Sequence, residues 1–229
     1  GIDEISTRVL KALNEKLVPS IVPFINKIIE SAKYPNQLKR AIVCPVFKRE
    51  GNKNDKENYR PISILPSINK IVEIVLLSRL EKFFRENEVF DKNQFAFRSK
   101  SGTDLALTEL FHHINTALDK NHLFGIVFVD IKKAYDSINH HVLLEKLELS
   151  GVRGHALKLF KDYLSNRQQA VRIRSELSDS SMIDKGIGQG SNLGPLLFNV
   201  KMNDFCNLPL RCKVIRYADD VALFFSFSP

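Results

Sequence analysis

The sequence of 229 residues predicts an α+β fold, and three observations point to it. Apolar residues recur at helical spacing through much of the first 120 residues, a nearly continuous apolar run at 123–129 is typical of a strand, and two apolar runs flank acidic residues between 213 and 227. We therefore expect antiparallel strands packed against helices. With 44% hydrophobic residues, the chain can bury one large domain or two packed subdomains.

The N-terminal half is expected to be mainly helical, with one short β-prone run followed by a polar loop rich in Lys, Asn and Asp. In order, these elements are helices at 3–17 and 20–33, a β-prone run at 41–47, a loop at 48–58, and helices at 67–88 and 103–119.

The C-terminal half begins with an apolar strand that ends at Asp130, and its composition fits a strand buried on both faces. Asn139 is the expected N-cap of the following helix, which ends near Gly151. The remaining expected elements are a helix at 154–164, an alternating strand at 170–174 with Arg172 and Arg174 facing outward, a glycine-rich loop at 186–191, a helix at 192–204 and a hairpin at 213–227.

Charge is distributed unevenly along the chain. Residues 1–100 carry 19 Lys and Arg against 12 Asp and Glu, whereas residues 101–200 carry 11 of each, and the net charge of the chain is +8. A basic half joined to a neutral half with aspartates at strand ends suits a polyanion-binding surface beside a metal site. An ordinary solvated basic surface accounts for the charge equally well.

Membrane and disulfide chemistry are not expected. No apolar stretch reaches the roughly 20 residues that cross a bilayer, and no signal-peptide pattern begins the chain, so we expect an intracellular protein without a membrane partner. Cys44, Cys206 and Cys212 form no C-x-x-C pair and are expected to be reduced thiols rather than zinc ligands. Both ends look cut from something longer, so a fragment is expected.

Three aspartates stand where apolar strands end, Asp130 after the first strand and Asp219 and Asp220 in the hairpin turn. A cluster of carboxylates implies a bound cation that offsets their repulsion, and hard oxygen ligands favour Mg²⁺. Two such ions about 3.5–4 Å apart can activate a hydroxyl and stabilise a leaving pyrophosphate. Taken alone, the Asp219–Asp220 pair is explained as well by a polar β-turn.

Five segments resemble the reverse transcriptases of non-LTR, LINE-like retrotransposons. Phe128-Val-Asp-Ile-Lys-Lys-Ala-Tyr-Asp136 resembles polymerase motif A, the segment 186–198 resembles motif B, and Tyr217-Ala-Asp-Asp220 is the YxDD of motif C. The segment 57–65 is similar to the fingers motif of the LINE-like branch, and Gln94-Phe-Ala-Phe-Arg98 is similar to the block that follows it. The resemblance covers roughly residues 35–225 and implies a right-hand polymerase fold.

The resemblance also implies a two-metal site. Asp130 and Asp219 would bind two Mg²⁺ ions, or Mn²⁺ in their place, with the carbonyl of Ile131 as a further ligand, and Asp220 would complete the acidic cluster. Tyr135 stands where the family has an aromatic steric gate, which leaves no room for a 2′-hydroxyl and so selects deoxynucleotides.

Further residues would hold the substrates. Gln189 would contact the incoming nucleotide, with flanking glycines that let the backbone approach it. Arg60 and Lys48 would hold the triphosphate of the dNTP. Asp136 is expected to be structural, as a cap of the next helix. RNA template and DNA primer are the other implied partners.

For domain organisation we expect fingers with N-terminal helices at 1–120 and a palm at 121–229 that carries motifs A, B and C. The thumb lies outside this sequence, and thumb and endonuclease are expected from the parent polyprotein. The family pattern is broken at Gly188, where proline is usual, at Ala96, where glycine is usual, and at Asn192, where an apolar residue is usual. Alanine at a position that needs positive φ would strain the backbone.

Three hypotheses follow. The first is an RNA-directed DNA polymerase domain. The second is a catalytically inactive nucleic-acid-binding remnant of a retroelement, which the three departures motivate. The third is another two-metal polymerase such as a group II intron maturase, against which the Asn58-Tyr-Arg-Pro-Ile-Ser63 block speaks.

Overall fold

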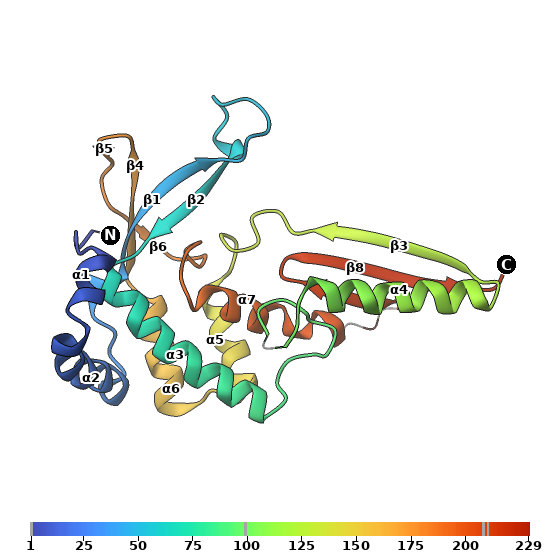
Figure 1. Ribbon diagram of the computed structural model, residues 1–229, viewed down its shortest axis with the longest axis horizontal. Coiled ribbons are helices and arrows are strands. Elements are labelled where there is room, and N and C mark those ends of the chain that lie inside the picture. Colours follow the sequence, from blue (N-terminus) through green and yellow to red (C-terminus); the bar gives the residue numbers. More distant parts are fainter. Residues whose placement is uncertain (1, 99, 208, 210) are drawn as a thin grey trace. The chain divides into compact units, whose positions relative to one another are not determined.

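The computed structural model describes residues 2–98, 100–207, 209 and 211–229 (Figure 1). It contains two compact units, each built from two separate stretches of the chain: unit 1 from 1–80 and 135–194, unit 2 from 81–134 and 195–229. The elements are, in chain order, α1 (Thr7–Ala12), α2 (Asn14–Ser31), η1 (Asn36–Lys39), β1 (Arg40–Phe47), η2 (Lys56–Asn58), β2 (Tyr59–Ile64), α3 (Ser67–Glu86), α4 (Thr103–Asp119), β3 (Leu123–Asp130), α5 (His140–Leu149), α6 (Gly154–Leu164), β4 (Arg167–Ile173), β5 (Glu176–Leu177), β6 (Ser181–Ile183), α7 (Gly194–Met202), η3 (Asn203–Asn207), β7 (Lys213–Tyr217) and β8 (Asp220–Phe227).

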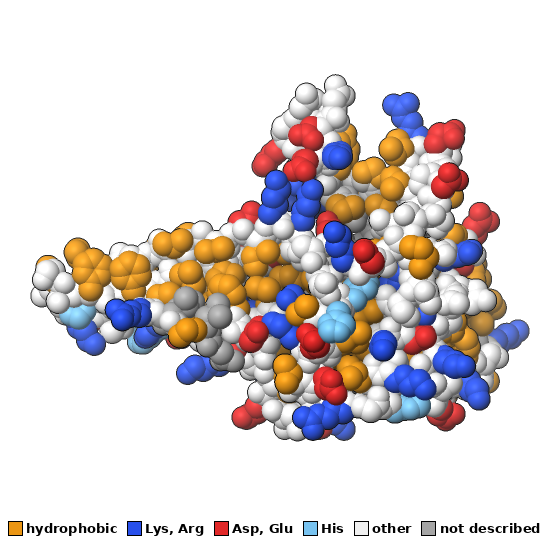
Figure 2. Space-filling model, turned by 180° about the vertical axis from the view of Figure 1, so that it is seen from behind, with side chains coloured by type: hydrophobic (Ala, Val, Ile, Leu, Met, Phe, Trp, Pro, Cys, Tyr) orange, Lys and Arg blue, Asp and Glu red, His pale blue; other side chains and the backbone are white. Residues whose placement is uncertain are grey.

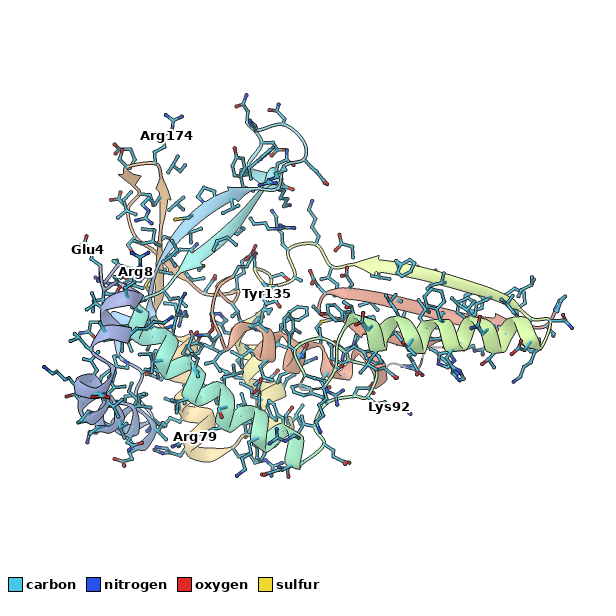
Figure 3. The ribbon with its side chains drawn as sticks, in the orientation of Figure 1. Glu4, Arg8, Arg79, Lys92, Tyr135 and Arg174 are labelled. Atoms are coloured by element: carbon cyan, nitrogen blue, oxygen red, sulfur yellow. The ribbon has the colours of Figure 1, made fainter. Side chains whose placement is uncertain are left out.

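The sheet of unit 1 is mixed. Its strand order is β2-β1-β4-β5, and β6 pairs with β4. The antiparallel β1–β2 pair forms a hairpin, plain in Figure 1, in which Val46 lies opposite Arg60 and Phe47 opposite Tyr59. The next strand, β4, runs parallel to β1. Arg172 and Arg174 are exposed, and Arg174 points outward at the β4–β5 turn (Figure 3), but the expected alternation is wrong, because Val171 and Ile173 are exposed as well.

The N-terminal helices exist, but their expected boundary is wrong. Ser6 caps α1 by accepting a hydrogen bond from the Arg8 amide, and α1 ends at Ala12. The break between the two helices therefore falls at Leu13 rather than near residue 19. Pro19 and Pro23 lie inside α2, which ends where Ala32 adopts a left-handed conformation with φ of 50°. No helix among the described residues is long and apolar enough to cross a membrane.

Unit 2 holds the antiparallel sheet β3-β8-β7, and α4 runs along its strands (Figure 1). Ala106 of α4 packs with Ile215, Ala222 and Phe224 of the sheet in a buried cluster. The expected C-terminal hairpin is therefore confirmed, as β7 and β8 pair from Tyr217 opposite Asp220 outward.

The expectation that β3 is buried on both faces is wrong. β3 stands at the edge of its sheet, and the side chain of Phe128 is 73% exposed while that of Val127 is 54% exposed. Figure 2 shows hydrophobic side chains gathered over the part of unit 2 that holds β3 and β8. An apolar run alone cannot distinguish a central strand from an edge strand of this kind.

A segment from Asn93 to Phe95 extends the palm-type sheet beyond β7. The amide of Phe95 donates to the Arg216 carbonyl at 2.9 Å, and the amide of Arg216 donates to the Asn93 carbonyl at 2.9 Å. The fully buried side chains of Gln94 and Asn199 are hydrogen-bonded at 3.0 Å. The segment 94–98, which resembles a block of the reverse transcriptases, therefore supports β7, the strand that leads into the turn with Asp219.

Cys44 and Cys212 are free thiols, each half-buried, whereas the side chain of Cys206 lies outside the described part of the structure. The division into fingers at 1–120 and palm at 121–229 stays a prediction, since units 1 and 2 are defined by compactness alone.

Candidate active site

The three aspartates come together at one end of the sheet in unit 2. Asp130 is the last residue of β3, and its Cα partner across the antiparallel ladder is Asp220, the first residue of β8. Asp219 occupies the two-residue turn between β7 and β8. Residues directly opposite each other in such a ladder have Cα atoms about 4.5–5.5 Å apart. Distant acidic residues are therefore neighbours in the fold, as motifs A and C predicted.

The turn geometry follows from its length. A two-residue hairpin loop requires a positive φ at its first central residue, and Ala218 has φ of 56° there. Ala218 is buried, while Asp219 is half-exposed and Asp220 exposed. The small alanine side chain thus anchors the turn and leaves the two acids accessible.

Negative charge is concentrated at this end of the sheet. Like charges directly opposite each other in a ladder are destabilising, and among the described residues no hydrogen bond or ion pair satisfies the side chains of Asp130, Asp219 or Asp220. The described residues contain no group of three His, Cys, Asp or Glu side chains already arranged as metal ligands. The oxygen donors present, which include the carbonyl of Ile131, have the chemistry that hard divalent ions prefer.

The remaining expected site residues lie in unit 1, where the β1–β2 hairpin carries two cations. Arg60 is exposed and lies opposite Val46. The exposed Lys48 follows two residues later, with its amide donating to the Asn58 carbonyl at 2.8 Å, so its side chain shares the hairpin face of Arg60. Its Nζ donates to the carbonyl of Glu57 at 2.8 Å.

Gln189 lies beside the same hairpin. Its carbonyl accepts a hydrogen bond from the Ser63 amide at 2.7 Å, and it forms a parallel bridge with Ile62, two residues from Arg60. Tyr135 lies in the segment between β3 and α5 (Figure 3), where its carbonyl accepts from the Ile187 amide at 3.0 Å. Unit 1 therefore holds all four expected substrate-binding residues: Gln189 lies in the loop at 186–193 and Tyr135 contacts it, while Arg60 and Lys48 lie on the hairpin beside it.

Two further contacts of this loop were not expected from the sequence. The Nε2 of Gln189 lies 3.3 Å and 3.4 Å from the carboxylate oxygens of Asp136, which orients the amide. Asp136 is not the cap of α5, because Asn139 accepts the capping bonds from the His141 and Val142 amides. The second contact is a hydrogen bond that the Asn192 amide donates to the carboxylate of Glu73 in α3. Its only indication in the sequence is an acidic residue within an apolar helix.

The departures from the family pattern are accommodated. Ala96 is buried and its φ is not positive; the left-handed residue is its neighbour Phe97, with φ of 55°, so the expected strain at Ala96 is wrong. A Cβ at Gly188 would lie 3.1 Å from the Ser63 hydroxyl. The amide side chain of Asn192 donates to the Lys70 carbonyl at 3.2 Å.

A hairpin that presents paired acids beside a facing acidic strand end, with helices packed on one face, is the arrangement of a nucleic-acid polymerase palm. Residues 51–228 match the sequence profile described as Reverse transcriptase (RNA-dependent DNA polymerase). The chain belongs to the reverse transcriptase family, and the expected α+β polymerase fold is confirmed.

Relatives and solved structures agree with this assignment. The chain is 32% identical to the probable RNA-directed DNA polymerase from transposon BS of Drosophila melanogaster, over 99% of this chain and 26% of that protein. It is 28% identical to the RNA-directed DNA polymerase from mobile element jockey of Drosophila funebris, over 97% of this chain and 25% of that protein. The resemblance to non-LTR reverse transcriptases is thereby confirmed, and the chain spans about a quarter of the length of these curated relatives.

Among solved structures, apo telomerase from Candida tropicalis superposes with a TM-score of 0.59 at 13% identity, covering 87% of this chain and 47% of that chain. A second telomerase structure from the same organism, in complex with a fragment of telomeric RNA, has the same TM-score at 14% identity, over 88% of this chain and 39% of that chain. At this level of identity the likeness concerns the fold.

Proposed function

We propose that this chain is part of an RNA-directed DNA polymerase that adds deoxynucleotides to a primer 3′-hydroxyl on an RNA template during retrotransposition. The observation that supports the proposal most is the pairing of Asp130 with Asp220 across the β3–β8 ladder, beside Asp219 in the turn. The family and the relatives named above support the choice of RNA as template.

In this proposal Asp130, Asp219 and the Ile131 carbonyl hold two Mg²⁺ ions, and Asp220 completes the acidic cluster. When bound, such ions supply activation of the attacking hydroxyl and stabilisation of the leaving pyrophosphate. The exposed carboxylates of Asp130 and Asp220 keep the end of the sheet negative and open to these ions. The rigid ladder holds them in place, so little reorganisation is needed as the reaction proceeds.

The residues of unit 1 would bind and select the nucleotide. Arg60 and Lys48 share one face of the β1–β2 hairpin, where two cations can compensate the triphosphate. Gln189, oriented by Asp136, would contact the base or sugar. The ring of Tyr135 would exclude a 2′-hydroxyl and so restrict the substrate to dNTPs.

The decisive test is Asp219→Asn in a protein that carries this chain, assayed for extension of a DNA primer on an RNA template with Mg²⁺ and dNTPs. We expect the rate of extension to fall by at least about 100-fold. Loss of a residue that only hydrogen-bonds to a metal ligand already lowers metal affinity or activity by about 10–100-fold, and Asp219 would be a ligand itself. Asp179→Asn, at an exposed aspartate after β5, is the matched control and should extend as the wild type does.

Full extension by Asp219→Asn would refute the site assignment. The second hypothesis, a noncatalytic nucleic-acid-binding remnant, has a different signature: the wild-type protein would bind RNA and add no nucleotide. A binding titration run beside the extension assay separates the two.

A further inference from the structure

The loop that carries Gln189 has no regular secondary structure of its own and contains glycines at 186, 188 and 190. Its first half is held from two sides. The Gly186 amide donates to the Ile138 carbonyl at 2.7 Å, and the amide of Ser63 in β2 donates to the Gln189 carbonyl at 2.7 Å. Its second half, Ser191 and Asn192, needs a different support, because neither of these contacts reaches it.

That support comes from α3: the Lys70 carbonyl accepts a hydrogen bond from the Asn192 side chain, and the second support is a buried acid, Glu73. Its side chain is fully buried. Oε2 accepts a hydrogen bond from the Asn192 amide at 2.7 Å, and Oε1 accepts one from the Tyr163 hydroxyl at 2.7 Å. One carboxylate therefore ties the loop to α3 directly and, at the same time, to α6 through Tyr163.

Tyr163 extends the connection to the base of α7. Its hydroxyl lies 3.2 Å from Oγ of Ser191, and that Oγ accepts from the Gly194 amide at 3.2 Å. Burial, reinforced by the charge of Glu73, raises the pKa of the Tyr163 hydroxyl far above its usual value of 10.0. The phenol therefore stays protonated and donates its O–H to Glu73.

A buried carboxylate is costly to maintain, since a charged group loses its hydration and must be compensated by hydrogen bonds and countercharge. Here the guanidinium of Arg167 stacks on the Tyr163 ring at 4.8 Å, and its Nη1 donates to the Tyr163 carbonyl at 3.2 Å. An apolar residue would fill the same space between α3 and α6 without that cost. An apolar residue cannot, however, accept a hydrogen bond from the Asn192 amide.

We propose that Glu73 is a positioning residue for nucleotide binding, which holds the loop at 186–193 so that Gln189 is presented to the incoming dNTP. This rests on the proposed function. If the loop is correctly placed in only a fraction of molecules, the apparent dissociation constant for the nucleotide rises by the inverse of that fraction. Glu73 thus acts on KM for dNTP and leaves the chemical step unchanged.

The experiment compares two variants that cut the connection with one that does not. Glu73→Gln replaces an acceptor with an amide that cannot accept from both Asn192 and Tyr163, and Tyr163→Phe removes the hydroxyl. Tyr34→Phe is the matched control: it also deletes a buried phenol hydroxyl, one bonded to Asn69 at 2.7 Å, and its ring packs edge-on against Tyr163, but it does not reach the loop.

Three quantities are measured for each variant: KM and kcat for dNTP in primer extension, and the hydrogen exchange rate of the peptide that contains Asn192. We expect KM to rise roughly tenfold in Glu73→Gln, because the Asn192 amide loses its charged acceptor, and in Tyr163→Phe, because Glu73 loses the hydroxyl that holds it. In both variants kcat should stay within about twofold. Exchange at Asn192 should accelerate in Glu73→Gln. Tyr34→Phe should lower the thermal midpoint, while KM, kcat and exchange at Asn192 stay at the wild-type level.

The outcomes separate this inference from the proposed function. If the wild-type protein adds no nucleotide, the proposed function is refuted. Hydrogen exchange at Asn192 in Glu73→Gln then decides by itself whether Glu73 holds the loop. Wild-type KM and unchanged exchange in Glu73→Gln overturn the inference. Should Glu73→Gln and Tyr163→Phe fail to fold, the wild-type protein decides: an Asn192 amide that exchanges as fast as an amide without a hydrogen bond overturns the inference.

Discussion

Gly190 shows at the scale of one residue why the loop beside β2 has its composition. Its φ is 122°, a conformation that L side chains rarely adopt, and a Cβ there would lie 2.6 Å from the Ser63 carbonyl oxygen. That oxygen belongs to the backbone of a paired strand and cannot move aside. The close approach of loop and strand therefore requires glycine for two independent reasons.

We expect Gly190→Ala to lower the free energy of unfolding by about 2 kcal/mol or more, since a strained backbone of this kind alone costs about 1–3 kcal/mol. The measurement is a urea titration followed by circular dichroism. Gly102→Ala is the control, because its Cβ would meet nothing within 4 Å and its φ is not positive. Equal stability of the two variants would show that the loop can move away from β2.

The acidic residues at the strand ends could be predicted from the sequence. The contacts that hold the neighbouring loop in place could not. The neighbourhood of Asp130 and Asp220 followed from apolar runs ending in acids and from the order of the motifs. The contact of Glu73 with Asn192 joins residues 119 positions apart. No periodicity records such a contact, because a buried acid on an amphipathic helix looks the same in sequence as a solvated one.

At the scale of elements, the helices and strands were predictable in kind but not in boundary or exposure. The first helical stretch is divided at Leu13. The capping bond of Ser6 begins α1, which is short, and α2 begins directly after Leu13. β3 was expected to be buried on both faces, and its position at the sheet edge leaves Phe128 exposed. Strand order is a property of tertiary pairing, which composition does not contain.

A histidine of α4, His113, packs against the sheet of unit 2. The ring of His113 lies 5.0 Å from that of Phe224, with Nζ of Lys213 in β7 at 3.2 Å from Nδ1 and the Glu109 carboxylate 3.2 Å from Nε2. Burial, then Lys213, lowers the pKa of His113 below its usual 6.5, against a smaller opposing effect of Glu109. The folded protein therefore binds this proton less readily than the unfolded chain.

The sign of the pH dependence follows from linkage. The stability that neutral His113 contributes is present above pH 6.5 and is lost as the pH falls from there through the folded-state pKa. We expect urea midpoints to decrease from pH 7 to pH 5.5, and His113→Phe to reduce that decrease. His112→Phe, at the exposed neighbour, should retain the wild-type slope. An identical slope in His113→Phe would contradict the prediction.

For the whole molecule, the net charge of +8 bears on the partner rather than on the fold. A phosphate backbone bound by lysines and arginines releases counterions, so affinity falls as salt rises. We expect the affinity for single-stranded RNA to fall at least roughly tenfold between 50 and 200 mM NaCl if about three phosphates are contacted. Fluorescence anisotropy measures this, and a salt-independent affinity would exclude a phosphate-binding role for the basic half.

Each compact unit is interleaved with the other along the chain, because 1–80 joins 135–194 and 81–134 joins 195–229. During synthesis, the first 80 residues emerge from the ribosome long before the stretch that completes their core. Likewise β3 can pair only after β8 has been made, and β8 begins with Asp220, the residue that lies opposite Asp130. A nascent chain that stops short of this strand would therefore display a bare sheet edge at Val127 and Phe128, and its acidic centre would not yet exist.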